Sequence, residues 1–133
     1  MSYKAKDESL NSNHTSCKLD LTYKMTPRVF FITGTSTGFG QELTKIAISR
    51  GDKVCATARN SSKLEAPQGA TKDNYLAVDL DVTKKDQIES AFNKAFEHFG
   101  RLDVVVNNAG YGLSGEFESL SEKQIRTQVS LQQ

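Results

Sequence analysis

The sequence predicts an α/β fold in which a parallel sheet carries helices on both faces. Two observations support this prediction. Short apolar runs alternate with amphipathic segments of helix length, and a glycine-rich turn joins the first apolar run to the first helical segment. Parallel strands need long crossover connections, which are usually helical and right-handed. We therefore expect a doubly wound sheet that binds its ligand beyond the carboxyl ends of the strands.

The folded part is predicted to be one domain over residues 28–133, because a chain of 133 residues suits a single domain. Residues 1–27 are polar and mixed in charge, with too few apolar side chains to offset the entropy of ordering them. We interpret them as a disordered extension. A transit peptide is the alternative, but this segment contains acidic residues and no arginine. Met25 could equally be the natural start.

Composition excludes several classes of function. The net charge of +1 gives no support for binding nucleic acid or a membrane surface, and no apolar run is long enough to span a bilayer. Cys17 and Cys55 fit neither a disulfide framework nor a metal site. We expect no nucleic-acid partner, no membrane partner and no bound metal, and we expect a reduced, cytoplasmic compartment.

The first half of the domain is predicted to form a strand, a helix and a second strand. Val29–Ile32 is a run of large apolar residues, typical of a strand buried on both faces. The next segment has apolar residues spaced as on one helical face, at Leu43, Ile46 and Ala47. Gly51 is a suitable C-terminal cap for that helix. Lys53–Ala58 predicts another buried strand, and residues 60–73 read as a loop with room for one helical turn.

The second half repeats the pattern. Tyr75–Val78 predicts a third strand, and Leu102–Val106 predicts a fourth. Between them, Thr83 and Asp86 have the spacing of a capping box before a helix that Gly100 closes. The apolar stripe of that helix is Ile88, Ala91, Phe92, Ala95, Phe96 and Phe99, and we expect its phenylalanines in the core. A last helix begins near Glu122, with Ser121 and Gln124 as its capping pair. The resulting order of elements favours a Rossmann-type sheet.

The glycine-rich turn is the first candidate site. Gly34, Gly38 and Gly40 follow the first strand and lead directly into a helix. Glycines let the backbone approach a bulky anion, and the free N–H groups at a helix start favour negative charge. This arrangement predicts a site for a nucleotide pyrophosphate. A tight strand-to-helix turn with no ligand is the alternative.

Arg59 lies just beyond the second strand, where dinucleotide folds select between cofactors. An arginine there pairs with the 2′-phosphate of NADP, whereas a carboxylate accepts from the 2′-hydroxyl of NAD. No acidic residue lies between Val54 and Lys63. The residue pattern therefore favours NADP (NADPH), the alternative being a solvated arginine in a polar loop.

The ends of the third and fourth strands carry further polar residues. Asp81 could accept a hydrogen bond from an exocyclic amine such as that of adenine, or it could serve the following helix N-terminus. Asn107, Asn108, Ala109 and Gly110 suit a place where backbone approaches a ligand and side chains tie strands together, although they could also form a simple turn.

Taken together, these motifs resemble the short-chain dehydrogenase/reductase family. Thr-Gly-x-x-x-Gly-x-Gly, the arginine, Asp-Val and Asn-Asn-Ala-Gly follow the four predicted strands in order. The resemblance covers residues 28–130 and implies the strand order 3-2-1-4. It also implies a cofactor site made of Gly34, Ser36, Thr37, Gly38, Phe39, Gly40, Arg59, Asp81, Val82, Asn108, Ala109 and Gly110. The basic residue that some NADP-selective members carry in the glycine turn is replaced by Thr35, Ser36 and Thr37.

The resemblance also implies a catalytic Asn, Ser, Tyr and Lys, the last two spaced Tyr-x-x-x-Lys. The sequence has Tyr3, Tyr23, Tyr75 and Tyr111, and none has lysine four residues later. We therefore expect no catalytic residue in this chain and a sheet truncated after about four strands. The fourth strand would then be an uncovered apolar edge, which predicts marginal stability or self-association through that edge.

Two hypotheses follow. The first is the cofactor-binding half of an NADP-dependent oxidoreductase, inactive alone, whose complete form acts on a small carbonyl or alcohol substrate. The second is a non-catalytic module that holds NADP or pairs with a full-length relative.

Overall fold

The computed structural model describes residues 26–112 and 117–132. The predicted disordered extension, residues 1–27, lies outside these ranges except for Thr26 and Pro27, so the proposed division of the chain stays a prediction. Within the described ranges, no helix is long and apolar enough to cross a membrane.

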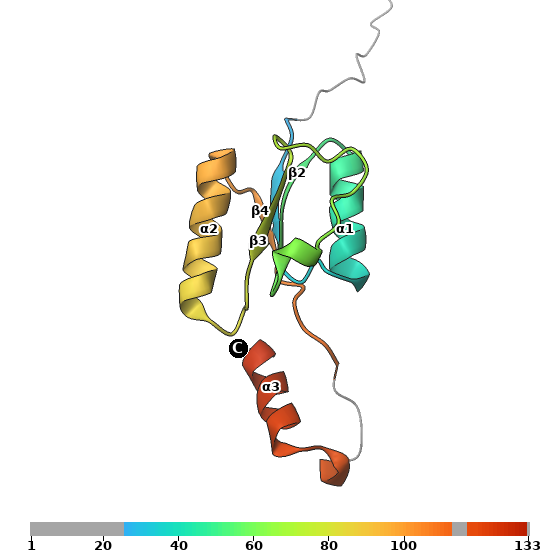
Figure 1. Ribbon diagram of the computed structural model, residues 1–133, viewed down its shortest axis with the longest axis vertical. Helices are drawn as coiled ribbons and strands as arrows, with labels where there is room; N and C mark the ends of the chain where they lie inside the picture. Colours follow the sequence, from blue (N-terminus) through green and yellow to red (C-terminus); the bar gives the residue numbers. More distant parts are fainter. Residues whose placement is uncertain (1–25, 113–116, 133) are drawn as a thin grey trace, which may run out of the picture.

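The sheet has the predicted topology. Its four strands are β1 (Val29–Ile32), β2 (Lys53–Ala58), β3 (Tyr75–Asp79) and β4 (Val104–Val106). All pairings are parallel and the order is β3-β2-β1-β4 (Figure 1). The two central strands are almost wholly buried, which confirms the prediction from their apolar runs, whereas β3 and β4 form the partly exposed edges.

Helices cover both faces of this sheet (Figure 1). Helix α1 (Gly38–Ser49) lies on one side, where Ile32 and Val54 join the apolar cluster of Ala47 and Ile48. Helix α2 (Lys85–Phe99) lies on the other side. Its cluster contains Phe31, Cys55, Val78, Leu80, Ala91 and Ala95. Neighbouring residues of one strand enter opposite clusters because side chains alternate along a strand.

The start of α2 differs from the prediction. Lys84 is its N-cap and makes no side-chain capping bond, so the expected capping box of Thr83 and Asp86 is wrong. The Thr83 hydroxyl instead donates to Oδ1 of Asp81 at 2.7 Å. The Thr83 side chain bonds to the Asp81 carboxylate, two residues earlier, instead of capping the helix, because local side-chain turns of this kind form readily.

The apolar stripe of α2 is narrower than expected. Ala91 and Ala95 are fully buried, and Phe92 stacks on Phe31 with ring centroids 4.3 Å apart. Phe96, however, is 57% exposed, so the prediction that it belongs to the core is wrong. At about 100° per residue it lies about 80° around the helix from Ile88, at the margin of the face that meets the sheet.

The remaining elements follow β2 and β4 in the chain. Short 3₁₀ turns η1 (Ser61–Lys63) and η2 (Phe117–Ser119) precede β3 and the last helix. Helix α3 (Glu122–Gln132) lies beyond the end of the sheet rather than against its face (Figure 1). Its predicted capping box is confirmed, since the Ser121 N–H donates to Gln124 Oε1 at 2.9 Å and the Gln124 N–H donates to Ser121 Oγ at 3.3 Å.

Candidate functional site

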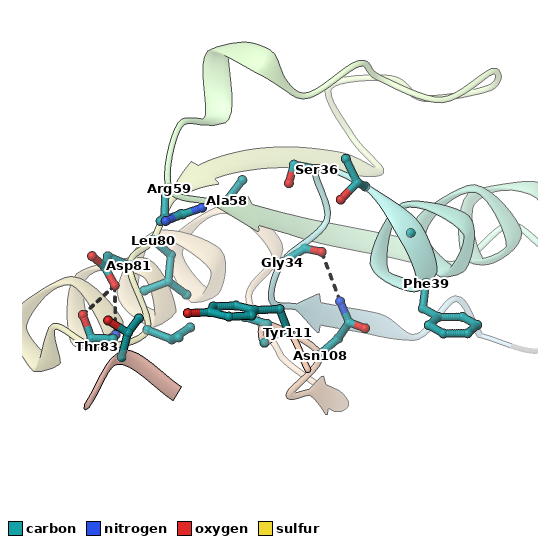
Figure 2. A pocket seen from close by; sticks show the side chains of 16 residues that line it. Gly34, Ser36, Phe39, Ala58, Arg59, Leu80, Asp81, Thr83, Asn108 and Tyr111 are labelled. Atoms are coloured by element: carbon teal, nitrogen blue, oxygen red, sulfur yellow. Dashed lines mark hydrogen bonds between the residues drawn. The ribbon is translucent and has the colours of Figure 1, made fainter. Parts of the chain in front are cut away.

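A cavity of about 520 Å³ opens at the carboxyl ends of the strands (Figure 2). It gathers all but one of the residues predicted to bind the cofactor: Gly34, Ser36, Thr37, Gly38, Phe39, Arg59, Asp81, Val82, Asn108, Ala109 and Gly110. Four segments that are far apart in the sequence supply these residues. A volume of this size is typical of sites for small molecules and cofactors.

Gly40 is the predicted residue that does not line the cavity. A Cβ atom at Gly40 would collide with the Gly34 carbonyl oxygen and with Nδ2 of Asn108. A Cβ at Gly34 would come 2.8 Å from Cα of Ala109. These two glycines therefore let the turn pack closely on itself and on the segment that follows β4, so their local role is close packing of backbone.

The start of α1 offers free backbone donors to the cavity. Thr37 is the N-cap and makes no side-chain capping bond, and the first turn carries no acidic residue. Gly38 has φ +62 and no atom within 4 Å of a would-be Cβ, so nothing covers the helix start there. Uncapped N–H groups together with the positive end of the helix dipole favour a bound anion.

Thr35 is directed away from the cavity. Its N–H and its hydroxyl both donate to the Thr57 carbonyl oxygen, at 2.9 and 3.1 Å. This fixes the turn against β2 and leaves Ser36 and Thr37 exposed on the cavity side. The turn is therefore anchored at its base and open at its tip.

Asn108 ties β4 to the glycine turn. Its Nδ2 donates to the carbonyl oxygens of Thr33 and Gly34, at 2.9 and 3.1 Å (Figure 2). The Thr33 hydroxyl accepts from the N–H groups of Asn108 and Ala109, both at 2.9 Å. The expectation that these amides tie strands together is met for Asn108, whose amide nitrogen is directed at the protein backbone.

Arg59 and Asp81 lie together on another side of the cavity (Figure 2). Hydrogen bonds from the Thr83 hydroxyl and N–H lower the pKa of Asp81, and the charge of Arg59 contributes further. The carboxylate is thus ionised at neutral pH. No hydrogen bond or ion pair of the Arg59 guanidinium is found within the described ranges, so its donors can serve a ligand.

Several lining residues were missed by sequence reasoning. Ala58, Leu80, Thr83, Tyr111 and Thr127 also border the cavity. Tyr111 directly follows the Asn-Asn-Ala-Gly motif, so its position could have been recognised. Thr127 belongs to α3, whose placement beyond the sheet no pattern in the sequence indicated. The described part of the chain contains no group of three His, Cys, Asp or Glu side chains placed to hold a metal.

The cavity combines several features that suit a nucleotide ligand. It joins an uncapped helix start, an arginine with free donors, an ionised carboxylate and apolar walls from Leu80 and Val82. The sheet order and the glycine turn after its central strand define the chain as a Rossmann-type α/β protein.

The family described as short chain dehydrogenase matches residues 28–132, and the chain belongs to it. An uncharacterized oxidoreductase of Schizosaccharomyces pombe is 39% identical over 110 residues, covering 81% of this chain and 36% of the relative. A protein of Dichelobacter nodosus described as a probable NADP-dependent dehydrogenase is 35% identical over 85 residues, covering 64% of this chain and 80% of that protein.

Solved structures agree with this assignment. A short-chain dehydrogenase from Streptomyces avermitilis matches with a TM-score of 0.72 and 36% identity, over 80% of this chain and 39% of that one. A 3-ketoacyl-(acyl-carrier-protein) reductase from Brucella melitensis, complexed with NADH, matches with a TM-score of 0.71 and 31% identity, over 78% of this chain and 43% of that one. The chain thus spans less than half the length of both structures.

Proposed function

We propose that this chain binds NADP in the cavity and provides the cofactor-binding half of an oxidoreductase that acts on a carbonyl or alcohol. The observation that carries the proposal is the convergence of an uncapped helix start and Arg59 on one cavity. These are two places for phosphate, as a phosphorylated dinucleotide requires. Membership of an oxidoreductase family supports the reaction type.

The choice of NADP rests on the residues after β2. Arg59 is followed by Asn60, Ser61 and Ser62, and no carboxylate there could accept from a ribose 2′-hydroxyl. The Dichelobacter relative is described as NADP-dependent, whereas the Brucella reductase was solved with NADH. These two descriptions point to different cofactors, and Arg59 is the support specific to this chain.

The residues of the chain would bind and orient the cofactor. Ser36, Thr37 and the first N–H groups of α1 would surround the pyrophosphate, and Arg59 would hold the 2′-phosphate. Asp81 and Val82 would flank the adenine, while Ala109 and Gly110 would lie beside the nicotinamide. When bound, that ring donates or accepts the hydride. We place the protein in the cytoplasm.

A second candidate is a non-catalytic module that holds NADP or pairs with a full-length relative. The 133 residues contain no Tyr-x-x-x-Lys, and the family's proton transfer would need that tyrosine. Adding a separately expressed C-terminal half of a relative distinguishes the two candidates. Restored turnover supports the first, and unchanged binding without turnover supports the second.

The test of cofactor binding is a titration of the full chain with NADPH and with NADH, followed by nucleotide fluorescence. We expect saturable NADPH binding that is tighter than NADH binding. Arg59→Ala should weaken NADPH by about ten- to a hundredfold, since a charged hydrogen-bonded contact is lost, and should leave NADH nearly unchanged.

Arg50→Ala is the matched control. Arg50 is an exposed arginine at the far end of α1, about 18 Å of helix away from the cavity. It should not alter either affinity. Equal weakening of NADPH by both substitutions, or no binding to a chain shown to be folded, would contradict the site.

A further inference from the structure

We propose that Tyr111 supplies the stacking surface for the adenine ring of the nucleotide. The proposal rests on the function proposed above and adds to it a residue that selects for a flat aromatic ring. Tyr111 borders the same cavity as Arg59 and Asp81 and is 49% exposed. Half of a large aromatic side chain thus remains available for contact with a ligand.

The orientation of Tyr111 supports this role. Figure 2 shows its ring lying across the cavity from the Asn108 side, with the hydroxyl directed toward Thr83 and Asp81. Phe39 is the other exposed aromatic residue of the lining, and in the same view its ring points away from this region. Tyr111 is therefore the aromatic residue that faces the end of the cavity where Asp81 lies.

The surroundings of the ring suit a purine. Leu80 and Val82 give that end of the cavity apolar walls, and Asp81 provides an ionised acceptor beside them. Oδ1 of Asp81 is used by Thr83, and its other carboxylate oxygen accepts no hydrogen bond from the described residues. A flat ring with an exocyclic amine could stack on Tyr111 and donate to that free oxygen.

The backbone just before Tyr111 is held in place. Asn108 and Ala109 are fixed to Thr33 by three hydrogen bonds of 2.9 Å, two accepted by its hydroxyl and one by its carbonyl oxygen. The approach of Ala109 to Gly34 restrains the same segment. The backbone two residues before Tyr111 is already ordered. Stacking a ligand on the Tyr111 ring therefore costs less conformational entropy than stacking on a free loop.

The test compares Tyr111→Ala and Tyr111→Phe with the unaltered full chain, using NADPH, ADP and nicotinamide mononucleotide as probes. Tyr111→Ala should weaken NADPH and ADP alike by about tenfold, the usual effect of losing a base–aromatic stack. Nicotinamide mononucleotide should bind Tyr111→Ala and the unaltered chain with equal affinity. Tyr111→Phe should retain the affinity, because the ring rather than the hydroxyl makes the contact.

Tyrosine fluorescence gives an independent readout. The chain has no tryptophan, so ADP should quench the emission of Tyr111 directly. Tyr111→Phe should abolish that part of the quenching while it keeps the affinity. Tyr75→Phe, which removes a hydroxyl from β3, should leave both affinity and quenching unchanged.

The outcomes separate this proposal from the proposed function. Unchanged or tighter ADP binding to Tyr111→Ala overturns the stacking role, even where NADPH binds the unaltered chain. Binding and quenching by ADP with no preference for NADPH over NADH supports stacking and contradicts the cofactor choice. Failure of every probe to bind the unaltered chain overturns both.

Discussion

At the scale of single residues, the glycines of the turn have different roles. Gly40 is required because no side chain fits between the Gly34 carbonyl and Asn108. Gly38 has open space around it and is favoured through its φ of +62, a conformation that costs other residues about 1 kcal/mol. The glycine spacing of the turn thus combines a steric requirement at Gly40 with a conformational requirement at Gly38.

Alanine substitutions should reveal this difference. Gly40→Ala should lower the free energy of unfolding by about 3 kcal/mol or more, since a backbone atom must move. Gly38→Ala should lower it by about 1 kcal/mol. Urea denaturation followed by circular dichroism measures both, and similar losses for the two variants would contradict the assigned roles.

Cys55 should be chemically silent in the folded protein. It is fully buried in β2, and burial raises the pKa of its thiol to about 12. The reactive thiolate is therefore scarce at neutral pH. In a Cys17→Ser variant, where Cys55 is the sole thiol, a disulfide reagent should react at pH 8 only after urea is added. Rapid labelling without urea would show that β2 is accessible.

At the scale of elements, hydrogen bonds between the segments that follow β1 and β4 shape one side of the cavity. Asn108→Ala removes two hydrogen bonds to backbone carbonyls, one of them to the glycine turn. We expect a loss of about 1–3 kcal/mol in the free energy of unfolding, because part-buried acceptors are left without partners. Asn107→Ala, at an exposed neighbour, should change it by less than about 0.5 kcal/mol. Equal effects in urea denaturation would contradict the role of Asn108.

The same pair of strands makes stability depend on pH. Hydrogen bonds from Arg101 and from the Val29 N–H lower the pKa of Asp103 in the folded chain. Its contribution to stability is complete above the unfolded value of about 3.9 and is lost as pH falls through the lower folded value. Asp103→Asn should therefore be less stable than the unaltered chain at pH 6, and the difference should shrink in acid.

Urea midpoints measured from pH 6 down to about pH 2 test this expectation. Asp73→Asn is a suitable control, since Asp73 is exposed and its carboxylate makes no hydrogen bond with any described residue. If the difference in urea midpoint between Asp103→Asn and the unaltered chain stays constant with pH, the carboxylate acts only through its shape.

The sequence predicts the elements well because their patterns are local. Strand β1 is a continuous apolar run and β2 is mostly apolar, and Ser121 with Gln124 forms the capping pair of α3 within four residues. Thr83 failed as a capping residue because Asp81, a nearer partner, also fitted. The position of Thr127 in the cavity depends on how α3 is placed in space, and no periodicity in the sequence encodes that placement. The position of Tyr111, in contrast, follows from its place directly after the Asn-Asn-Ala-Gly motif.

At the scale of the whole molecule, the sheet ends in an incompletely covered strand. Strand β4 pairs with β1 alone among the described strands, and Val105 is 46% exposed. Parallel sheets are usually covered on both faces and edges of this kind recruit other strands. We expect the chain to self-associate through β4.

Size-exclusion chromatography with light scattering should show a mass that rises with concentration. Val105→Lys should shift the chain toward monomer, because a charge on an edge strand opposes pairing. Val129→Lys is the matched control: the same residue type, 49% exposed, but on α3. A monodisperse monomer that melts cooperatively at every concentration would contradict the expectation.

The pairing of β1 with β4 also has a consequence for how the chain folds. The N–H of Val29 donates to Asp103, 74 positions later, and Thr33 meets Asn108 across 75 positions. Contacts this distant close a long loop and form late. At about 5–20 residues per second of synthesis, β1 waits several seconds for its partner to leave the ribosome. Until then the cavity lacks the segment from Asn108 to Tyr111 that lines one of its sides, so the proposed nucleotide site is incomplete in the nascent chain.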